Sequence, residues 1–167
     1  MTGLAAPEPL AKHHDVERFD CGDAALNAWL VDHAWPAQRA GTARTYVTHR
    51  DGVVRGYYSL AAGSVVPRDV PQRVSAGGGR HPVPIVVLAR LAVDRDEQGG
   101  GVGTSLVRDA LFRIAGAADI VGVRAVLVHV KHPDLAAFYE RFDFEPGPAD
   151  EHQMFLLMKD LRRALET

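Results

Sequence analysis

The chain has 167 residues, 47% of them hydrophobic, and a formal net charge of −2, which is enough material for one domain, residues 1–167, with a buried core. No apolar run approaches the ~20 residues of a membrane span, and the N-terminus lacks the basic start and long apolar region of a secretory signal. The single cysteine, Cys21, excludes an intramolecular disulfide and argues against a cysteine-based metal cluster, so we expect a cytoplasmic protein without a membrane segment.

Hydrophobic periodicity and turn residues predict, in chain order, a strand over 9–16, helices from 22 or 23 to 30 and over 34–40, and strands over 42–49, 53–66 and 84–93. After the glycine cluster they predict a helix that ends near 118, a strand over 123–130 and a helix over 133–141. A hairpin of 142–146 with 153–158 and a short helix over 160–165 complete the chain. Asp51-Gly52 marks a hairpin turn, and Gly56 and Gly63 mark bulges or bends. Residues 67–84 form a connection that we expect to be exposed and mobile. This order predicts an α/β fold, with a mixed sheet and helices on both faces.

One stretch, residues 88–111, joins an apolar strand through a glycine cluster to an amphipathic helix. The first N–H groups of a helix have no internal partner and bind anions, and glycine lets the backbone approach a phosphate closely. A Walker loop is excluded because no lysine follows the glycines, and the dinucleotide fingerprint G-x-G-x-x-G fails in both possible registers. The pattern that fits is Gln98-x-x-Gly101-x-Gly103. By itself, a glycine-rich turn before a helix is more often structural than functional.

Charge is unevenly distributed along the chain. Residues 1–34 carry a net charge of −4, residues 35–94 carry +5 and residues 131–167 carry −3. Most of the basic residues are arginines, whose planar fork suits phosphate contacts. Two interpretations stay open at this point: a compositional bias with solvated arginines, or a basic face that meets a phosphate-rich partner.

Three motifs resemble one family in order. The glycine pattern resembles the pyrophosphate loop of the GNAT acetyltransferases, which hold acetyl-CoA. Residues 132–145, His-Pro-Asp-Leu-Ala-Ala-Phe-Tyr-Glu-Arg-Phe-Asp-Phe-Glu, resemble the family's Asn-Pro-x-x-Ala-x-x-Phe-Tyr-x-x-x-Gly-Phe helix. Residues 19–30, Phe-x-Cys-Gly-x-x-x-Leu-Asn-x-Trp-Leu, with Tyr-Tyr-Ser-Leu at 57–60, resemble a narrower branch, the GNAT toxins of bacterial type II toxin–antitoxin modules.

The resemblance implies a GNAT fold with a mixed central sheet of six to seven strands. It implies an acetyl-CoA-dependent enzyme that acetylates the α-amino group of aminoacyl-tRNA, blocks translation, and is neutralised by a cognate ribbon-helix-helix antitoxin. A homodimer is also implied, and no metal is. The alternatives are a GNAT enzyme for a small amine, peptide or antibiotic, and a non-catalytic protein that represses its own promoter with a DNA-binding antitoxin.

The resemblance also assigns residues. Tyr139 matches the tyrosine that protonates the CoA thiolate. The expected cofactor contacts are backbone groups of Leu91, Ala92 and Val93 on the pantetheine arm, with one N–H polarising the thioester carbonyl, and backbone N–H groups of Gln98, Gly99, Gly100, Gly101, Val102, Gly103 and Thr104 on the pyrophosphate. The candidates for tRNA contact are Arg90, Arg39, Arg44, Arg73 and Arg80.

A dedicated strong base is not required, because an α-amino group has a pKa near ~8 that an adjacent ester lowers further. We therefore expect Asp94 and Glu97, which flank the loop, to be solvated carboxylates rather than bases. His129 is expected to be a core histidine. Two positions depart from the family pattern: His132 stands where Asn is common, which leaves a pantetheine contact open, and Asp143 stands where a turn glycine is usual, although Asp tolerates the left-handed conformation.

Overall fold

The structure is a computed structural model that describes residues 3–166. The chain divides into two compact units: unit 1 is Met1–Ala61 with Arg90–Ala110, and unit 2 is Ala62–Ala89 with Leu111–Thr167. No helix within residues 3–166 is both long and apolar enough to cross a membrane.

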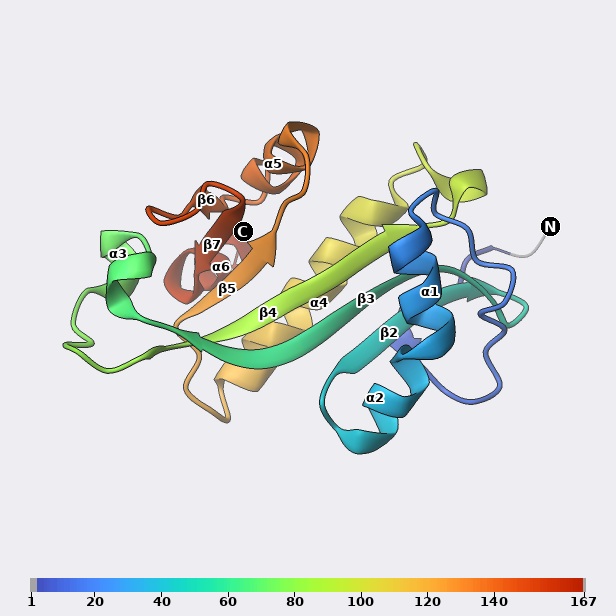
Figure 1. Ribbon diagram of the computed structural model, residues 1–167, viewed down its shortest axis with the longest axis horizontal. Coiled ribbons are helices and arrows are strands. Elements are labelled where there is room, and N and C mark those ends of the chain that lie inside the picture. Colours follow the sequence, from blue (N-terminus) through green and yellow to red (C-terminus); the bar gives the residue numbers. More distant parts are fainter. Residues whose placement is uncertain (1–2, 167) are drawn as a thin grey trace. The chain divides into compact units, whose positions relative to one another are not determined.

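The elements are β1 (Glu8–Pro9), α1 (Ala24–Asp32), α2 (Ala34–Ala40), β2 (Arg44–Arg50), β3 (Val53–Val65), η1 (Pro67–Asp69), α3 (Gln72–Ser75), β4 (Val83–Val93), η2 (Arg95–Glu97), α4 (Val102–Ala118), β5 (Ala125–His129), α5 (Pro133–Glu140), β6 (Glu145–Pro146), β7 (Gln153–Leu157) and α6 (Met158–Leu165) (Figure 1). The strand order is β1-β2-β3-β4-β5-β7-β6. The pairing of β4 with β5 is parallel, whereas β1 with β2, β2 with β3, β5 with β7 and β6 with β7 are antiparallel. The expected α/β fold with a mixed sheet of six to seven strands is confirmed.

Local signals placed α1, α2 and the hairpin of β2 and β3 correctly. The Asp23 side chain accepts hydrogen bonds from the N–H groups of Ala25 and Leu26 at 2.9 and 3.3 Å, which caps α1. α2 ends at Gly41, whose φ of 77° is the left-handed stop that glycine permits. The hairpin between β2 and β3 turns at Asp51 and Gly52, with φ of 49° and 87°. These helices and this hairpin therefore follow from residues close together in the sequence.

Both faces of β3 are covered within unit 1 (Figure 1). On one face, the Tyr57 hydroxyl donates to the Leu26 carbonyl of α1 at 2.7 Å. On the other face, the Tyr58 hydroxyl donates to the carboxylate of Asp109 on α4. A β-bulge beside Gly56 was expected and is present, with the pairing shifted between Thr48 and the next residue. A Cβ at Gly56 would lie 3.1 Å from Leu106 Cδ1, so the glycine lets α4 approach the sheet closely.

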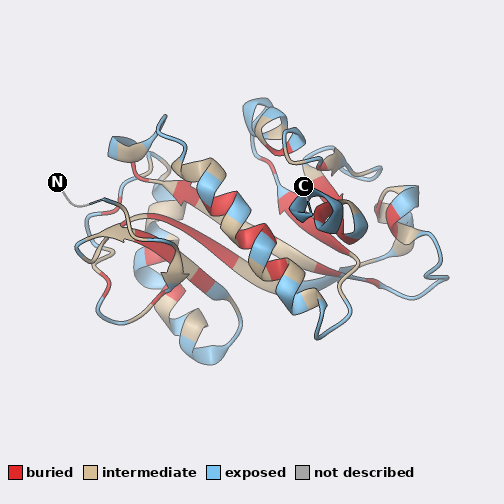
Figure 2. Cartoon of the chain, turned by 180° about the vertical axis from the view of Figure 1, so that it is seen from behind, coloured by how far each residue is buried: buried red, intermediate tan, exposed pale blue. Residues whose placement is uncertain are grey.

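Unit 2 buries the parallel pair β4 and β5 together with β7. Its core cluster is Val70, Val74, Val83, Ile85, Ala125, Leu127, Phe155 and Leu157, and Figure 2 shows buried residues running along these strands. The Arg124 guanidinium donates to the Val74 and Arg73 carbonyls at 2.8 and 3.0 Å, which holds the end of α3. This short helix is therefore fixed by contacts from a distant part of the chain.

Three expectations were wrong. The first strand covers two residues rather than 9–16, because the chain turns where the His14 N–H donates to the Ala11 carbonyl. The connection over 67–84 is not uniformly exposed, because η1 and α3 form within it and Val70 and Val74 are buried. His129 ends β5 but is exposed, because Val128 and Val130 on either side of it are buried and the alternation of side chains turns His129 to the opposite face.

Candidate active site

The glycine cluster forms a turn that leads directly into the N-terminus of a 17-residue helix, α4. Gly99 and Gly101 both have φ of 85°, a conformation that side chains rarely adopt. The Ser105 N–H donates to the Gly101 carbonyl, so the residues between them are the first turn, whose N–H groups have no partner inside the helix. Gly99 to Thr104 therefore form the kind of backbone cradle that binds a phosphate group.

Gln98 anchors this turn. Its side-chain amide donates to the Val93 carbonyl at 2.8 Å and to the Cys21 carbonyl at 3.1 Å. Its backbone N–H is directed to the Arg95 carbonyl at 3.4 Å. Gln98 thus ties the turn to the end of β4 and to the segment before α1, and the N–H groups that face outward begin at Gly99.

Asp94 is 3% exposed, so the expectation of a solvated carboxylate was wrong. Its two oxygens accept the N–H groups of Asp96 at 3.0 Å and Asp20 at 3.1 Å, and the Arg55 guanidinium lies 3.4 Å away. No sequence pattern indicated Asp20 as a partner, because it lies 74 residues earlier. Asp94 therefore joins the start of the glycine loop to the segment before α1.

Glu97 is held by an arginine. Arg50 Nε and Nη2 donate to its two carboxylate oxygens at 2.9 and 3.1 Å. This pairing holds the pKa of Glu97 below its ordinary value of 4.5. Because its pKa is lowered and both of its oxygens are paired, this carboxylate is a weak general base.

We expect the Glu97→Gln variant to lose stability in a pH-dependent manner. Because the folded-state pKa is lowered, ionised Glu97 stabilises the fold above pH 4.5, and this contribution disappears as the pH falls through the folded-state value. Urea unfolding should therefore show a gap between wild type and variant at neutral pH that narrows in acid. A gap that stays constant across the acid range would contradict the assignment.

The C-terminal part of β4 continues beyond its neighbour. Its register with β5 runs from Ile85 to Leu88, whereas the strand extends to Val93. Where a strand extends past its neighbour, its N–H and C=O groups on that side can form hydrogen bonds with an extended ligand. Leu91 to Val93 are therefore suited to the pantetheine contacts that the resemblance implies.

Tyr139 lies on α5, which begins with Pro133 in its first turn. The side chain is 6% exposed, and its ring meets Phe138 and Phe144 edge-on at 5.1 and 5.4 Å. Burial raises the pKa of Tyr139 well above its ordinary value of 10. Within residues 3–166 no hydrogen-bond acceptor is found for its hydroxyl, so the proton is available for donation. Asp143 closes the following turn with φ of 70°, which confirms that aspartate takes the place of the usual glycine.

The five arginines expected to meet tRNA have different environments. Arg73 Nη2 lies 2.9 Å from Asp160 and its Nη1 lies 3.7 Å from Glu145, so this arginine is paired within unit 2. Arg44 donates to the Gln38 carbonyl at 3.2 Å. Arg39 and Arg80 are exposed, and Arg90 is half-buried over the ring of Trp29. The positive block at 35–94 is therefore partly neutralised by carboxylates.

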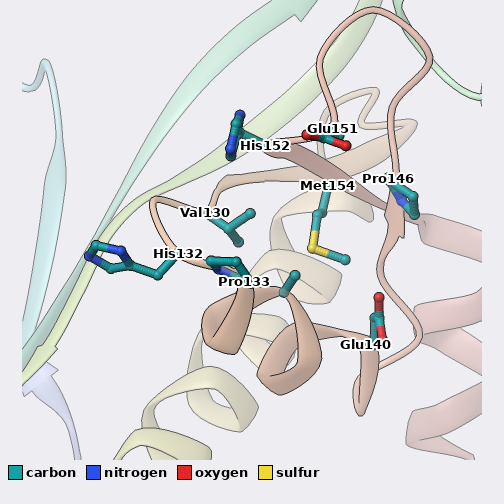
Figure 3. Close-up of a pocket in the computed structure, with 9 residues that line it drawn as sticks. Val130, His132, Pro133, Glu140, Pro146, Glu151, His152 and Met154 are labelled. Carbon is teal, nitrogen blue, oxygen red and sulfur yellow. The ribbon is translucent and has the colours of Figure 1, made fainter.

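A cavity of about 310 Å³ lies in unit 2, lined by residues of α5, β6 and β7 and their connections. Figure 3 shows Met154 pointing toward α5, while the imidazole of His132 extends away from it. Tyr139 is not among the lining residues. The cavity combines apolar surface with the carboxylates of Glu140 and Glu151.

A group near the N-terminus has the composition of a metal site: Glu8, His13 and His14 offer ligand atoms within 4.8 Å of one another. However, His14 Nδ1 accepts a backbone N–H, so Nε2 carries the proton and donates to Glu8 Oε1 at 2.8 Å. His49 does the same at 2.7 Å, and both bonds hold the pKa of Glu8 below 4.5. A metal ion would need the nitrogen lone pairs that these protons occupy. Glu8, His14 and His49 therefore form a hydrogen-bonded cluster.

A family model, a related sequence and solved structures all match this chain. Residues 41–146 match the family model of the acetyltransferase (GNAT) domain. A tRNA-acetylating toxin of Mycobacterium tuberculosis is 46% identical over 162 residues, which cover 97% of each chain. The structure of AtaT complexed with acetyl-methionyl-tRNAfMet has a TM-score of 0.90 and 29% identity, covering 98% of this chain and 99% of that one. A mutant AtaT bound to the C-terminus of the antitoxin AtaR and to acetyl-CoA has a TM-score of 0.83 and 28% identity, covering 98% and 99%.

Proposed function

Because this chain belongs to the GNAT acetyltransferase family, we propose that it transfers the acetyl group of acetyl-CoA to the α-amino group of aminoacyl-tRNA and thereby blocks translation. The observation that carries the proposal is the 46% identity with a tRNA-acetylating toxin over 97% of both chains. The solved AtaT complexes, one with acetylated aminoacyl-tRNA and one with acetyl-CoA, support the same substrate and donor.

In the proposed reaction, the first-turn N–H groups from Gly99 to Thr104 bind the pyrophosphate, and Gln98 positions that turn. Backbone groups of Leu91, Ala92 and Val93 align the pantetheine arm, and one N–H polarises the thioester carbonyl. The neutral α-amino group attacks this carbonyl, the carbon–sulfur bond breaks, and Tyr139 protonates the departing thiolate. The paired state of Arg73 makes Arg90, Arg39, Arg44 and Arg80 the stronger candidates for tRNA contact.

The proposal extends to partners and organisation. We propose that a cognate antitoxin of the ribbon-helix-helix type neutralises the protein, that two copies form a homodimer, and that residues 1–167 act as a single acetyltransferase domain. The AtaR complex of the structural relative supports the antitoxin. Because aminoacyl-tRNA is used in the cytoplasm, we place the activity there.

The test follows labelled acetyl groups from acetyl-CoA into total charged tRNA, with uncharged tRNA, polyamines and peptides as parallel acceptors. We expect label in the tRNA fraction only when the aminoacyl group is present. Tight binding of acetyl-CoA combined with label in polyamines or peptides but not in charged tRNA would keep the family and overturn the substrate, leaving a small-amine or peptide acetyltransferase.

A further inference from the structure

Arg90 and Trp29 form a stacked pair within unit 1. The guanidinium carbon of Arg90, on β4, lies 4.1 Å from the centroid of the Trp29 ring, on α1. At this distance the cation lies against the face of the indole. Both side chains are half-buried, so the stack reaches the surface of the unit. It forms a positively charged, partly exposed platform.

The platform has a rigid support. The Trp29 ring is stacked on Tyr57 at 6.0 Å with an interplanar angle of 11°, and Phe19 meets Tyr57 edge-on at 5.5 Å. The Tyr57 hydroxyl is fixed by the Leu26 carbonyl at 2.7 Å. The orientation of the indole is therefore set by buried aromatic neighbours before any ligand arrives.

Arg90 also differs from other half-buried arginines. Arg50 is bidentate with Glu97, Arg55 faces Asp94, and Arg124 donates to backbone carbonyls. For Arg90, no carboxylate or carbonyl partner is found in the part of the chain that the structure describes. Its N–H donors therefore have no partner in the described part of the chain, and a planar guanidinium suits a ligand that combines an aromatic ring with nearby phosphate.

We propose that the Arg90–Trp29 stack is a base-stacking subsite for the unpaired nucleotide at the 3′ end of the acceptor tRNA. This inference rests on the proposed function. Arg90 directly precedes Leu91, the first of the three residues whose backbone groups are proposed to align the pantetheine arm and polarise the thioester, and successive strand residues advance by about 3.3 Å. A base one sugar away from the aminoacyl ester therefore falls within reach of the platform. Stacking on arginine and aromatic groups is a common way to bind single-stranded nucleotides.

The adenine of acetyl-CoA has the same ring chemistry and is the second possible source. The proposed pyrophosphate cradle begins at Gly99, and the pantetheine arm along Leu91 to Val93 leads from the thioester toward that cradle. Because the adenine follows the pyrophosphate in CoA, these residues would hold it beyond Gly99 rather than beside Arg90. The acceptor end is therefore the occupant to which the geometry points, and the experiments separate the two sources.

The first experiment combines a protein change with a substrate change. Charged tRNA with an intact terminal adenosine is compared with charged tRNA whose terminal base is replaced by hydrogen, using wild type, Arg90→Met and Arg90→Lys. For wild type, removing the base should lower kcat/KM by about tenfold, the size expected for one stacked base. For Arg90→Met, removing the base should have little further effect. Arg90→Lys keeps the charge but not the plane, so it should behave like Arg90→Met.

A purely structural role for Arg90 would lower activity on both substrates equally and leave their ratio at the wild-type value, which would overturn the proposal. If Arg90→Lys kept the wild-type ratio of kcat/KM between the two substrates, the positive charge alone would account for the effect of the base. That result would also overturn stacking.

The second experiment measures binding without catalysis. The chain has two tryptophans, Trp29 and Trp35, so Trp35→Phe leaves fluorescence from Trp29 alone. We expect the trinucleotide CCA to quench this signal, and the quench to disappear when Arg90→Met is added. Acetyl-CoA alone should leave the signal unchanged; quenching by acetyl-CoA but not by CCA would assign the platform to the cofactor and overturn the proposal.

The two proposals fail differently. Acetylation of charged tRNA with no base effect and no CCA quench would overturn the platform and leave the function intact. A CCA quench that depends on Arg90, without acetylation of any charged tRNA, would overturn the function and leave the nucleotide subsite.

Discussion

Replacing Tyr139 with phenylalanine should lower kcat for acetyl transfer by about 10²–10⁴-fold, the range expected for a positioned general acid. The ring contacts with Phe138 and Phe144 do not involve the hydroxyl, so the variant keeps its packing. What it loses is a hydroxyl whose raised pKa keeps it protonated throughout the neutral range. Steady-state kinetics with charged tRNA measures kcat, and a binding titration measures the affinity for acetyl-CoA.

Binding of acetyl-CoA should be almost unchanged in Tyr139→Phe, because backbone groups supply the proposed cofactor contacts. Tyr58→Phe is a matched control, since the Tyr58 hydroxyl is also buried but donates to Asp109. That variant should lose stability and keep kcat. If Tyr139→Phe retained kcat within about threefold, a smaller loss than removing a general acid produces, another group would have to protonate the thiolate.

Replacing Asp94 with alanine should lower the free energy of unfolding by about 3 kcal/mol, as is typical when one partner of a buried charged network is removed. The change leaves the N–H groups of Asp20 and Asp96 without their acceptor and leaves Arg55 without its nearest carboxylate. Urea unfolding measures the loss. Acetyl-CoA binding should also weaken, because the turn before the cofactor loop depends on these bonds.

Asp96→Ala is the control for this prediction. The Asp96 side chain is 82% exposed and lies 3.6 Å from Arg55, so its removal should change the unfolding free energy by less than about 0.5 kcal/mol, as at most surface positions. Asp94→Asn, which keeps one acceptor oxygen, should fall between the two. Equal stability of Asp94→Ala and Asp96→Ala would show that the buried hydrogen bonds contribute nothing beyond an exposed pair.

The sequence by itself determined the elements whose causes are local. Asp23 caps α1, Gly41 stops α2 and Asp51-Gly52 turns the first hairpin, because each requires only residues a few positions apart. The glycine loop before α4 was readable for the same reason, since positive φ at Gly99 and Gly101 is a property of glycine itself. The alternation of strands and helices also fixed the fold class.

The tertiary structure alone decided which partner each charged side chain meets. Asp94 is buried against Asp20, Arg50 holds Glu97, Arg73 pairs with Asp160, and Arg90 stacks on Trp29. The three hydrogen-bonded pairs among them join residues that lie 47 to 87 positions apart in the sequence. Composition counts such charges but does not reveal whether they are solvated, because that depends on which distant segments the fold brings together. The stacking of Arg90 on Trp29, and with it the proposed nucleotide subsite, could therefore be recognised only in the folded chain.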